Sequence, residues 1–120
     1  MVIEDLWQKA IDEHNSSEFH EAHEFFEDLW MELDNRTEKD IVQTLAQADA
    51  LAVHLETGNL RAAQRLMRQL PELLQTFPDS YRGINLKEMK EWIFDKVSKI
   101  PQIGIVPDIL DIVPPKLSNS

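Results

Sequence analysis

Histidines and glutamates gather in one short stretch of the chain, and these residue types can bind metal ions or move protons. From Glu18 to Trp30 the sequence reads EFHEAHEFFEDLW. On a helix, His23 and Glu27 lie one turn apart on the same face. Phe19 and Trp30 flank the pair on that face. We therefore expect His23 and Glu27 to point toward the core.

The other charged residues of this stretch fall on different faces of the same helix. His20 and Glu24 form a second pair one turn apart, rotated toward the rim. Glu21, Asp28 and Glu32 fall on the opposite side, where we expect solvent. The stretch is thus an amphipathic helix with polar side chains at its apolar border.

A second polar stripe follows in the next predicted helix. Gln43, Gln47, Ala50 and His54 project close to one line along that helix, with Asp40 nearby. If the two helices pack as antiparallel neighbours, the His23 face meets this stripe. The sequence then predicts a buried polar network inside an otherwise apolar bundle.

Three chemical interpretations of this network are open. In the first it is structural: glutamines orient the imidazole and supply donors to the carboxylate. In the second, His23, Glu24, Glu27 and His54 bind a divalent metal ion. In the third, a His–Glu pair in a pocket of low dielectric constant acts as an acid and base.

The metal interpretation rests on incomplete motifs. The zinc motif H-E-x-x-H is not completed, because Glu27 stands where its second histidine belongs. The Glu-x-x-His spacing of di-iron bundles is also missing, because His20 stands three residues before His23. The residue types therefore indicate a site more clearly than they indicate its ligand.

Composition limits the classes of protein to which the chain can belong. Its 120 residues suit one domain, and it contains no cysteine, which excludes disulfides and thiolate chemistry. The net charge of -10 disfavours nucleic acid and anionic membranes as partners. The first residues do not resemble a signal peptide, and no apolar run is long enough to span a bilayer. We expect a cytoplasmic protein.

Apolar periodicity predicts an all-α fold, a compact bundle of about five helices. The third helix, apolar almost all round, should be central. Thr37 and Asp40 form a weak capping pattern at its start, and Gly58 and Asn59 suit its end and the next start. Pro71 should kink or end the fourth helix. The predicted helices cover about residues 3–14, 18–33, 38–57, 60–69 with a further stretch to 77, and 86–98.

The C-terminal residues differ in character from the bundle. We expect residues 1–100 to form the helical bundle domain and residues 101–120 an irregular arm, because prolines recur there among apolar residues. Such an arm should pack on its own domain, on a second copy in a homo-oligomer, or on a protein partner. Residues 117–120 are expected to fray.

Two further features of the sequence are charged residues in the predicted third and fourth helices. Arg61, Arg65 and Arg68 recur along one face of the fourth helix. They could bind a phosphate or carboxylate ligand, or complement the acidic helix. Asp49 interrupts the apolar surface of the third helix and needs a donor if it is buried. A lysine, an arginine or the Trp7 indole is expected to supply it.

Two blocks of sequence resemble one family of small helical proteins, domain of unknown function 309. Residues 19–30 resemble its pattern F-x-E-A-H-E-x-x-E-x-x-W, and residues 43–47 and 54–60 resemble Q-G-x-x-Q and H-x-x-x-G-N. The resemblance implies an all-α bundle in which these two helices pack together, and it implies no activity. Thr44 and Asp49 depart from the pattern. The polar positions that it marks are Glu21, His23, Glu24, Glu27, Gln43, Gln47, His54 and Asn59.

These observations favour a small helical binding or scaffolding protein with a structural His/Glu/Gln cluster. The alternative is a metal-dependent, hydrolase-like enzyme that uses the His and Glu ligands. The two differ in one observable feature. An enzyme needs a cleft that a substrate can enter, whereas a purely structural network is closed and has its polar atoms paired.

Overall fold

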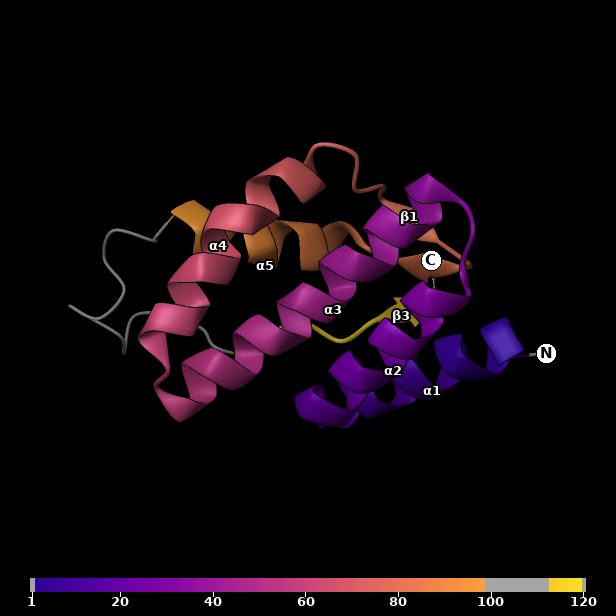
Figure 1. Cartoon of the computed structure of the whole chain (residues 1–120), viewed down its shortest axis with the longest axis horizontal. Helices are drawn as coiled ribbons and strands as arrows, with labels where there is room; N and C mark the ends of the chain where they lie inside the picture. Colours follow the sequence, from indigo (N-terminus) through magenta and orange to yellow (C-terminus); the bar gives the residue numbers. More distant parts are fainter. Residues whose placement is uncertain (1, 99–112, 120) are drawn as a thin grey trace.

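The computed structural model describes residues 2–98 and 113–119 and confirms the all-α prediction (Figure 1). Each helix packs on the one before it along the chain, so that α3 lies between α2 and α4. The helices in the described part of the chain are α1 (Val2–Asn15), α2 (Phe19–Glu32), α3 (Arg36–Thr57), α4 (Leu60–Leu74) and α5 (Lys87–Ser98).

Helix α3 is central because its side chains are apolar, and many of them small, on nearly every side. Ala46, Ala48 and Ala52 are buried, and their short side chains allow neighbouring helices to approach closely. Larger side chains such as Leu45 and Leu51 fill the space between these helices. The predicted central helix is therefore observed.

The ends of α3 are set by short side-chain contacts. The Asn35 side chain accepts a hydrogen bond from the Glu38 backbone N–H at 3.0 Å, so the helix begins at Arg36. The predicted start near Glu38, with Thr37 as the cap, is wrong because Asn35 caps the helix earlier. At the other end Gly58 takes a left-handed conformation with φ of 76°, which glycine adopts without strain.

Helix α4 continues through Pro71, so of the two predicted outcomes, a kink or an end, the proline does not end the helix. Proline removes one backbone donor, but a helix tolerates this where packing holds both sides in place. Met67 and Leu70 before the proline are fully buried, and Leu73 and Leu74 after it pack partly against the core. This continuous apolar face keeps the helix intact to Leu74.

A small sheet that the sequence did not predict follows α4. Strands β1 (Ser80–Tyr81) and β2 (Ile84–Asn85) pair in antiparallel fashion. Between them Arg82 and Gly83 both have positive φ, 48° and 79°, as in a two-residue type I′ hairpin turn. The Arg82 guanidinium binds the carboxylates of Glu4 at 2.6 Å and Glu38 at 3.2 Å, which ties the hairpin to α1 and α3.

The described end of the chain packs back on the bundle. Strand β3 (Ser118–Asn119) adds to β2, and Leu117 is 2% exposed. The Asn15 side chain binds both the N–H and the carbonyl of Leu117, each at 2.7 Å. The prediction that residues 117–120 fray is therefore wrong for residues 117–119. The predicted path of the arm over residues 101–112 and its boundary at residue 100 lie outside the described residues.

Within the described ranges, none of the helices combines the length and the apolar composition that a bilayer-spanning segment needs.

Candidate functional site

His23 joins α2 to α3 and fixes the position of Glu27. Its Nδ1 lies 2.8 Å from the Ala46 carbonyl oxygen, which can only accept, so Nδ1 donates. Its Nε2 lies 2.8 Å from Glu27 Oε1. The Glu27 side chain is 63% exposed, whereas that of His23 is 25% exposed. The prediction that Glu27 points into the core is therefore wrong: it lies at the rim of the seam between the helices.

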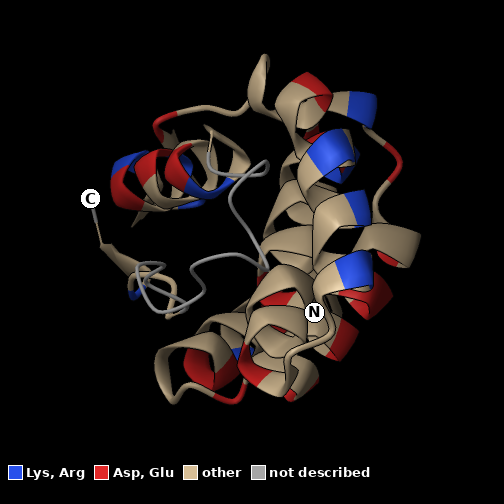
Figure 2. Ribbon diagram, turned by 90° about the vertical axis from the view of Figure 1, so that its left-hand side faces the viewer, with Lys and Arg blue, Asp and Glu red and all other residues tan. Residues whose placement is uncertain are grey.

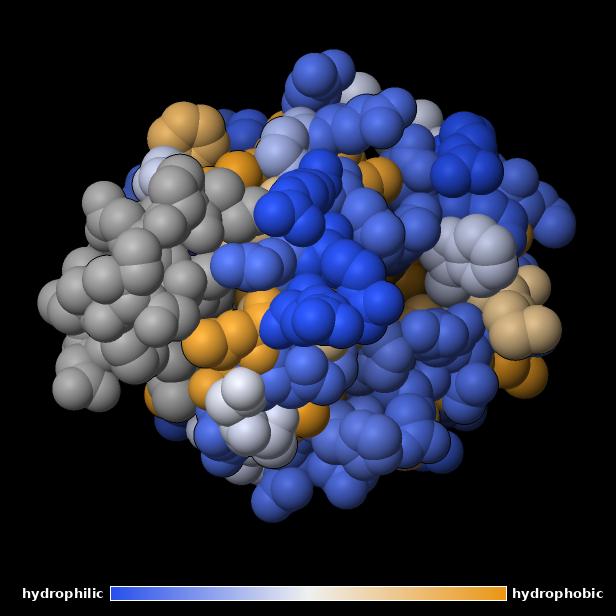
Figure 3. All heavy atoms as spheres, turned by 60° about the vertical axis from the view of Figure 1, so that its left-hand side comes forward, coloured by the Kyte–Doolittle hydropathy of each residue, from blue (hydrophilic) through white to orange (hydrophobic). Residues whose placement is uncertain are grey.

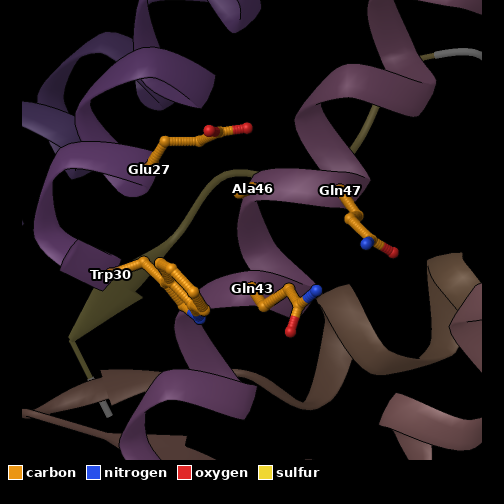
Figure 4. A pocket seen from close by; sticks show the side chains of 5 residues that line it. All are labelled: Glu27, Trp30, Gln43, Ala46 and Gln47. Carbon is orange, nitrogen blue, oxygen red and sulfur yellow. The ribbon is translucent and has the colours of Figure 1, made fainter. Parts of the chain in front are cut away.

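A surface hollow opens beside this pair, between α2 and α3 (Figure 4). Its volume is about 210 Å³, and its lining is formed by Glu27, Trp30, Gln43, Ala46 and Gln47. Trp30 and Glu27 project from α2 into the space between the two helices, while Gln47 turns away from Trp30. The two helices that the sequence predicted to face each other thus form the walls of this hollow.

A second, larger hollow adjoins the first on the other side of α3. Gln43 and Gln47 line both hollows, which together form what we call the glutamine groove. The second hollow has a volume of about 570 Å³. Its lining comes from α3 and from the end of α4: Arg36, Asp40, Gln43, Gln47, Gln69, Glu72, Leu73, Gln75 and Thr76.

Two buried polar atoms of the groove lining lack a hydrogen-bond partner among the described residues, Trp30 Nε1 and Gln47 Oε1. The amide nitrogen of Gln47 makes only a long bond of 3.4 Å to Gln69 Oε1. Leaving such an atom unpaired costs about 1–3 kcal/mol. Buried polar atoms left unpaired in a folded protein require an explanation, and one such explanation is that a ligand pairs with them.

Lys39 covers one face of the Trp30 ring. Its Nζ lies 3.8 Å from the ring centroid and donates to the Trp30 carbonyl at 2.8 Å. A cation over an indole face is an attractive contact that holds the ring in place. Trp30 is therefore fixed in orientation although its own N–H has no partner in the described part of the chain.

A third hollow, of about 210 Å³, lies on the other side of His23. It is lined by His20, His23, Ala50, Val53 and His54. Partial burial lowers the pKa of His54 below its usual 6.5, and the positive charges of Arg65 and His23 lower it further. His54 thus shares a hollow with His23 and is disfavoured from carrying a charge near neutral pH.

The structure does not bring the four predicted metal ligands together. Glu24 is exposed and pairs with His20 at 2.9 Å, away from Glu27. His54 lies in the third hollow rather than in the groove. Among residues 2–98 and 113–119 no group of three or more His, Asp or Glu side chains could hold a metal ion. The prediction of a divalent metal therefore rests on the sequence alone.

The other two signature positions lie apart from the groove. Glu21 is exposed on α2. Asn59 caps α4, where its side chain accepts a hydrogen bond from the Ala62 N–H at 3.3 Å. Of the predicted polar cluster, the structure brings Glu27, Gln43 and Gln47 to one groove and His23 and His54 to one hollow.

The most deeply buried polar pair was missed by the sequence reasoning. His14 on α1 and Asp49 on α3 are 2% and 0% exposed. His14 Nδ1 lies 2.6 Å from Asp49 Oδ1, and its Nε2 lies 2.8 Å from the Pro115 carbonyl oxygen. The expectation that a lysine, an arginine or the Trp7 indole partners Asp49 is wrong, because His14 is already oriented toward it by α1.

The pKa values of both members of this buried pair are raised above their ordinary values. Burial pulls the pKa of His14 down, but the hydrogen bond and the charge of Asp49 outweigh it and raise that pKa above 6.5. Burial raises the pKa of Asp49 above 3.8, opposed by the hydrogen bond and charge of His14 and by the charge of His23. One signal in the sequence could have revealed the pair: His14 follows Ile11 by three residues and Trp7 by seven, which places it on the apolar face of α1.

The family described as "Domain of unknown function (DUF309)" matches residues 7–66. The chain belongs to this family. The DUF309 match runs from the middle of α1 into α4, so it includes the α2 and α3 walls of the groove but not the end of α4. It also includes the buried His14–Asp49 pair.

One relative is a protein of Aquifex aeolicus (strain VF5) that bears the name "Uncharacterized protein". It is 30% identical over 96 residues, which is 79% of this chain and 28% of the relative. The chain thus spans little more than a quarter of that relative's length. No solved structure matches the chain.

Proposed function

We propose that this DUF309 protein is a small binding module that holds an extended segment of a partner protein in the glutamine groove. One observation carries the proposal: a buried donor, Trp30 Nε1, and a buried acceptor, Gln47 Oε1, belong to side chains that line the groove and lack partners among the described residues. A peptide backbone presents carbonyl and N–H groups in alternation, which is what these two atoms require.

The lining of the groove suits a main chain better than it suits a charged small molecule. Four of its side chains are glutamines, and each carries an acceptor and two donors on one flexible arm. Of its four charged members, Arg36 binds Asp40 at 2.7 Å, while Glu27 and Glu72 leave the lining acidic, which disfavours an anionic small molecule. Amide groups without net charge recognise other amide groups.

The His/Glu part of the cluster then has a positioning role. His23 is held by the Ala46 carbonyl and in turn holds Glu27 at the mouth of the groove. A partner N–H that meets Glu27 finds a carboxylate already oriented, which reduces the entropy lost on binding. This role fits the structural interpretation of the cluster and requires no metal ion.

Two broader expectations accompany this proposal. A partner-binding module with this charge pattern suits the cytoplasm, and the longer Aquifex aeolicus relative is an example of the unit within a larger chain. We further propose that the apolar C-terminal arm mediates self-association. Substituting Ile105 and Ile109 by Asp should reduce the oligomer size in sedimentation if the arm joins copies of the chain, and an unchanged size would remove that role.

The groove can be tested without knowing the natural partner. We would select dodecamer peptides from a random displayed library on the intact protein and titrate the best of them into ¹⁵N-labelled protein. The three tryptophans give three indole N–H signals, and Trp30→Phe identifies the one from Trp30. A backbone carbonyl that binds Trp30 Nε1 shifts this signal, while the Trp7 and Trp92 signals stay in place.

A matched pair of variants separates the groove from the rest of the surface. Gln43→Ala with Gln47→Ala should abolish peptide binding, whereas Gln8→Ala with Gln64→Ala, outside the groove lining, should leave it unchanged. Selected peptides that bind both double variants equally, or that leave the Trp30 signal unmoved, would show that the groove is not the site.

A further inference from the structure

Helix α4 presents three arginines on its solvent side. Arg61, Arg65 and Arg68 follow one another at helical spacing and are exposed. The opposite face of the helix is buried in the core through Ala62, Ala63, Met67 and Leu70. We call Arg61, Arg65 and Arg68 the arginine stripe.

None of these arginines makes an ion pair with a carboxylate in the described part of the chain. The protein has 22 acidic and 12 basic residues, so carboxylates are plentiful. Arg36 and Arg82 do find them, at 2.7 and 2.6 Å. The expected charge complementarity with the acidic helix thus forms no ion pair among the described residues, and the three exposed guanidinium groups can bind an external anion.

The stripe forms a local positive surface on an acidic protein. Figure 2 shows basic positions following one another down one side of the molecule, with acidic positions gathered below them. In Figure 3 strongly hydrophilic side chains run through the middle of this face. The effect reaches neighbouring groups, because the charge of Arg65 contributes to the lowered pKa of His54.

The stripe leads directly into the glutamine groove. Gln69, which lines the groove, lies one helical turn after Arg65, and Glu72 lies one turn after Arg68. A chain that leaves the groove along α4 therefore passes over the stripe. The two surfaces can contact one continuous partner segment.

We infer that the arginine stripe binds carboxylates of the partner segment, so that the partner is acidic next to the part that enters the groove. This inference rests on the proposed function for the path of the segment. Guanidinium groups bind carboxylates through paired hydrogen bonds. Along α4, Arg61 and Arg65 are separated by a rise of ~6 Å, close to the ~6.7 Å between side chains on one side of an extended strand.

An acidic protein segment suits the stripe better than nucleic acid does. Binding to a phosphate backbone scales with the number of clustered cations, and here three stand on a chain of net charge -10. The repulsion from the rest of the protein acts on a long polyanion more than on a short acidic segment. The same argument disfavours an anionic bilayer.

The test uses two labelled peptides of twelve residues, one alternating Ser and Glu and the other alternating Ser and Gln. Fluorescence anisotropy at low salt measures their affinity for the intact protein. The Ser–Glu peptide should bind more tightly, and Arg61→Gln/Arg65→Gln/Arg68→Gln should weaken it about tenfold, the combined effect of three exposed ion pairs. The Ser–Gln peptide should be unaffected by the variant.

A control variant with the same total charge separates the stripe from net charge. Lys9→Gln/Lys87→Gln/Lys116→Gln removes three exposed cations elsewhere and should change the affinity less than about twofold. Equal weakening by both triple variants would overturn the inference. So would undetectable binding of the Ser–Glu peptide, or tighter binding of a thymidine dodecamer or of phosphatidylglycerol vesicles.

The Trp30 indole signal distinguishes this inference from the proposed function. If both peptides shift that signal and bind equally well, the groove binds main chain but the stripe has no role, and the inference fails alone. If the Ser–Glu peptide binds through the stripe while the Trp30 signal stays unmoved, the stripe is upheld and the groove proposal fails.

Discussion

Replacing His14 by Ala should be among the most destabilising single changes in this protein. The substitution leaves the Asp49 carboxylate buried and without its partner on Oδ1, while its Oδ2 already lacks one in the described structure. Removing one member of a buried ion pair costs about 3–5 kcal/mol. A domain of this size has a total stability of about 5–15 kcal/mol, so the variant should be close to its folding limit.

Chemical unfolding followed by circular dichroism measures this loss. Asp49→Asn is the informative companion, because it keeps the volume and a hydrogen bond to His14 but removes the charge, so it should cost less than His14→Ala. Replacing both residues by Leu should recover part of the loss, since no buried charge remains. If His14→Ala lowers the free energy of unfolding by less than about 1 kcal/mol, the pair is not the buried contact that the distances indicate.

The same pair predicts a direction of pH dependence. The folded-state pKa of His14 is raised above 6.5, so its stabilising contribution is complete below pH 6.5 and is lost as the pH rises through the folded-state pKa. The raised pKa of Asp49 acts in the same direction above 3.8. His23 also faces Asp49 through its charge and must be considered with the pair. Unfolding free energies measured from pH 6 upward should fall in the wild type and fall less in the double Leu variant; parallel curves would contradict the assignment.

The remaining predictions concern the helix cap, the chain end and the metal hypothesis. Asn35→Ala should lower the free energy of unfolding by about 1 kcal/mol in urea titrations, because the Glu38 N–H loses its cap; no change would mean that the cap contributes nothing. Leu117→Ala should cost about 2–4 kcal/mol and speed hydrogen exchange at residues 84 and 85, where β3 pairs; unchanged exchange would contradict its docking. Elemental analysis of protein purified without an affinity tag should find metal well below one equivalent, unaltered by Glu27→Gln, because no three-ligand group forms in the described residues; stoichiometric zinc, iron or manganese lost in that variant would restore the metal hypothesis.

The helices could be predicted because their apolar periodicity is strong and their caps are local. The central place of α3 followed from its small apolar residues, and Gly58 marks its end as expected. The hairpin escaped prediction because two-residue strands show no periodicity. The Arg82–Gly83 turn, with two positive φ values, reverses the chain between the two strands. The continuation of α4 through Pro71 depends on tertiary packing on both sides of the proline. The local sequence does not reveal this packing.

The site was predicted in its location and less well in its geometry. The signature stretches pointed to the seam between α2 and α3. Each stretch places its polar residues one turn apart on one face of its helix, and the two faces pack against each other there. The rotation of α2 was not predictable to the accuracy that burial requires, so Glu27 was expected inside and lies at the rim. The His14–Asp49 pair joins residues 35 positions apart. Its formation depends on how α1 packs against α3, which local patterns do not specify.

Both polar regions of this bundle leave buried atoms without a partner among the described residues, and they differ in where these atoms lie. Asp49 Oδ2 belongs to a side chain that is 0% exposed, whereas Trp30 Nε1 and Gln47 Oε1 belong to side chains that line a surface hollow. Both ring nitrogens of His14 have acceptors, and the pair holds α1, α3 and the chain end together. In the groove, Trp30 is fixed in orientation by Lys39, yet its indole N–H and the side-chain carbonyl of Gln47 find no partner among the described residues. Each unpaired atom is costly, but one in the wall of a hollow stands where a ligand can enter. Rigid walls with unpaired groups are what a ligand can use. The groove that these walls form continues across α3 to the end of α4, where the arginine stripe begins.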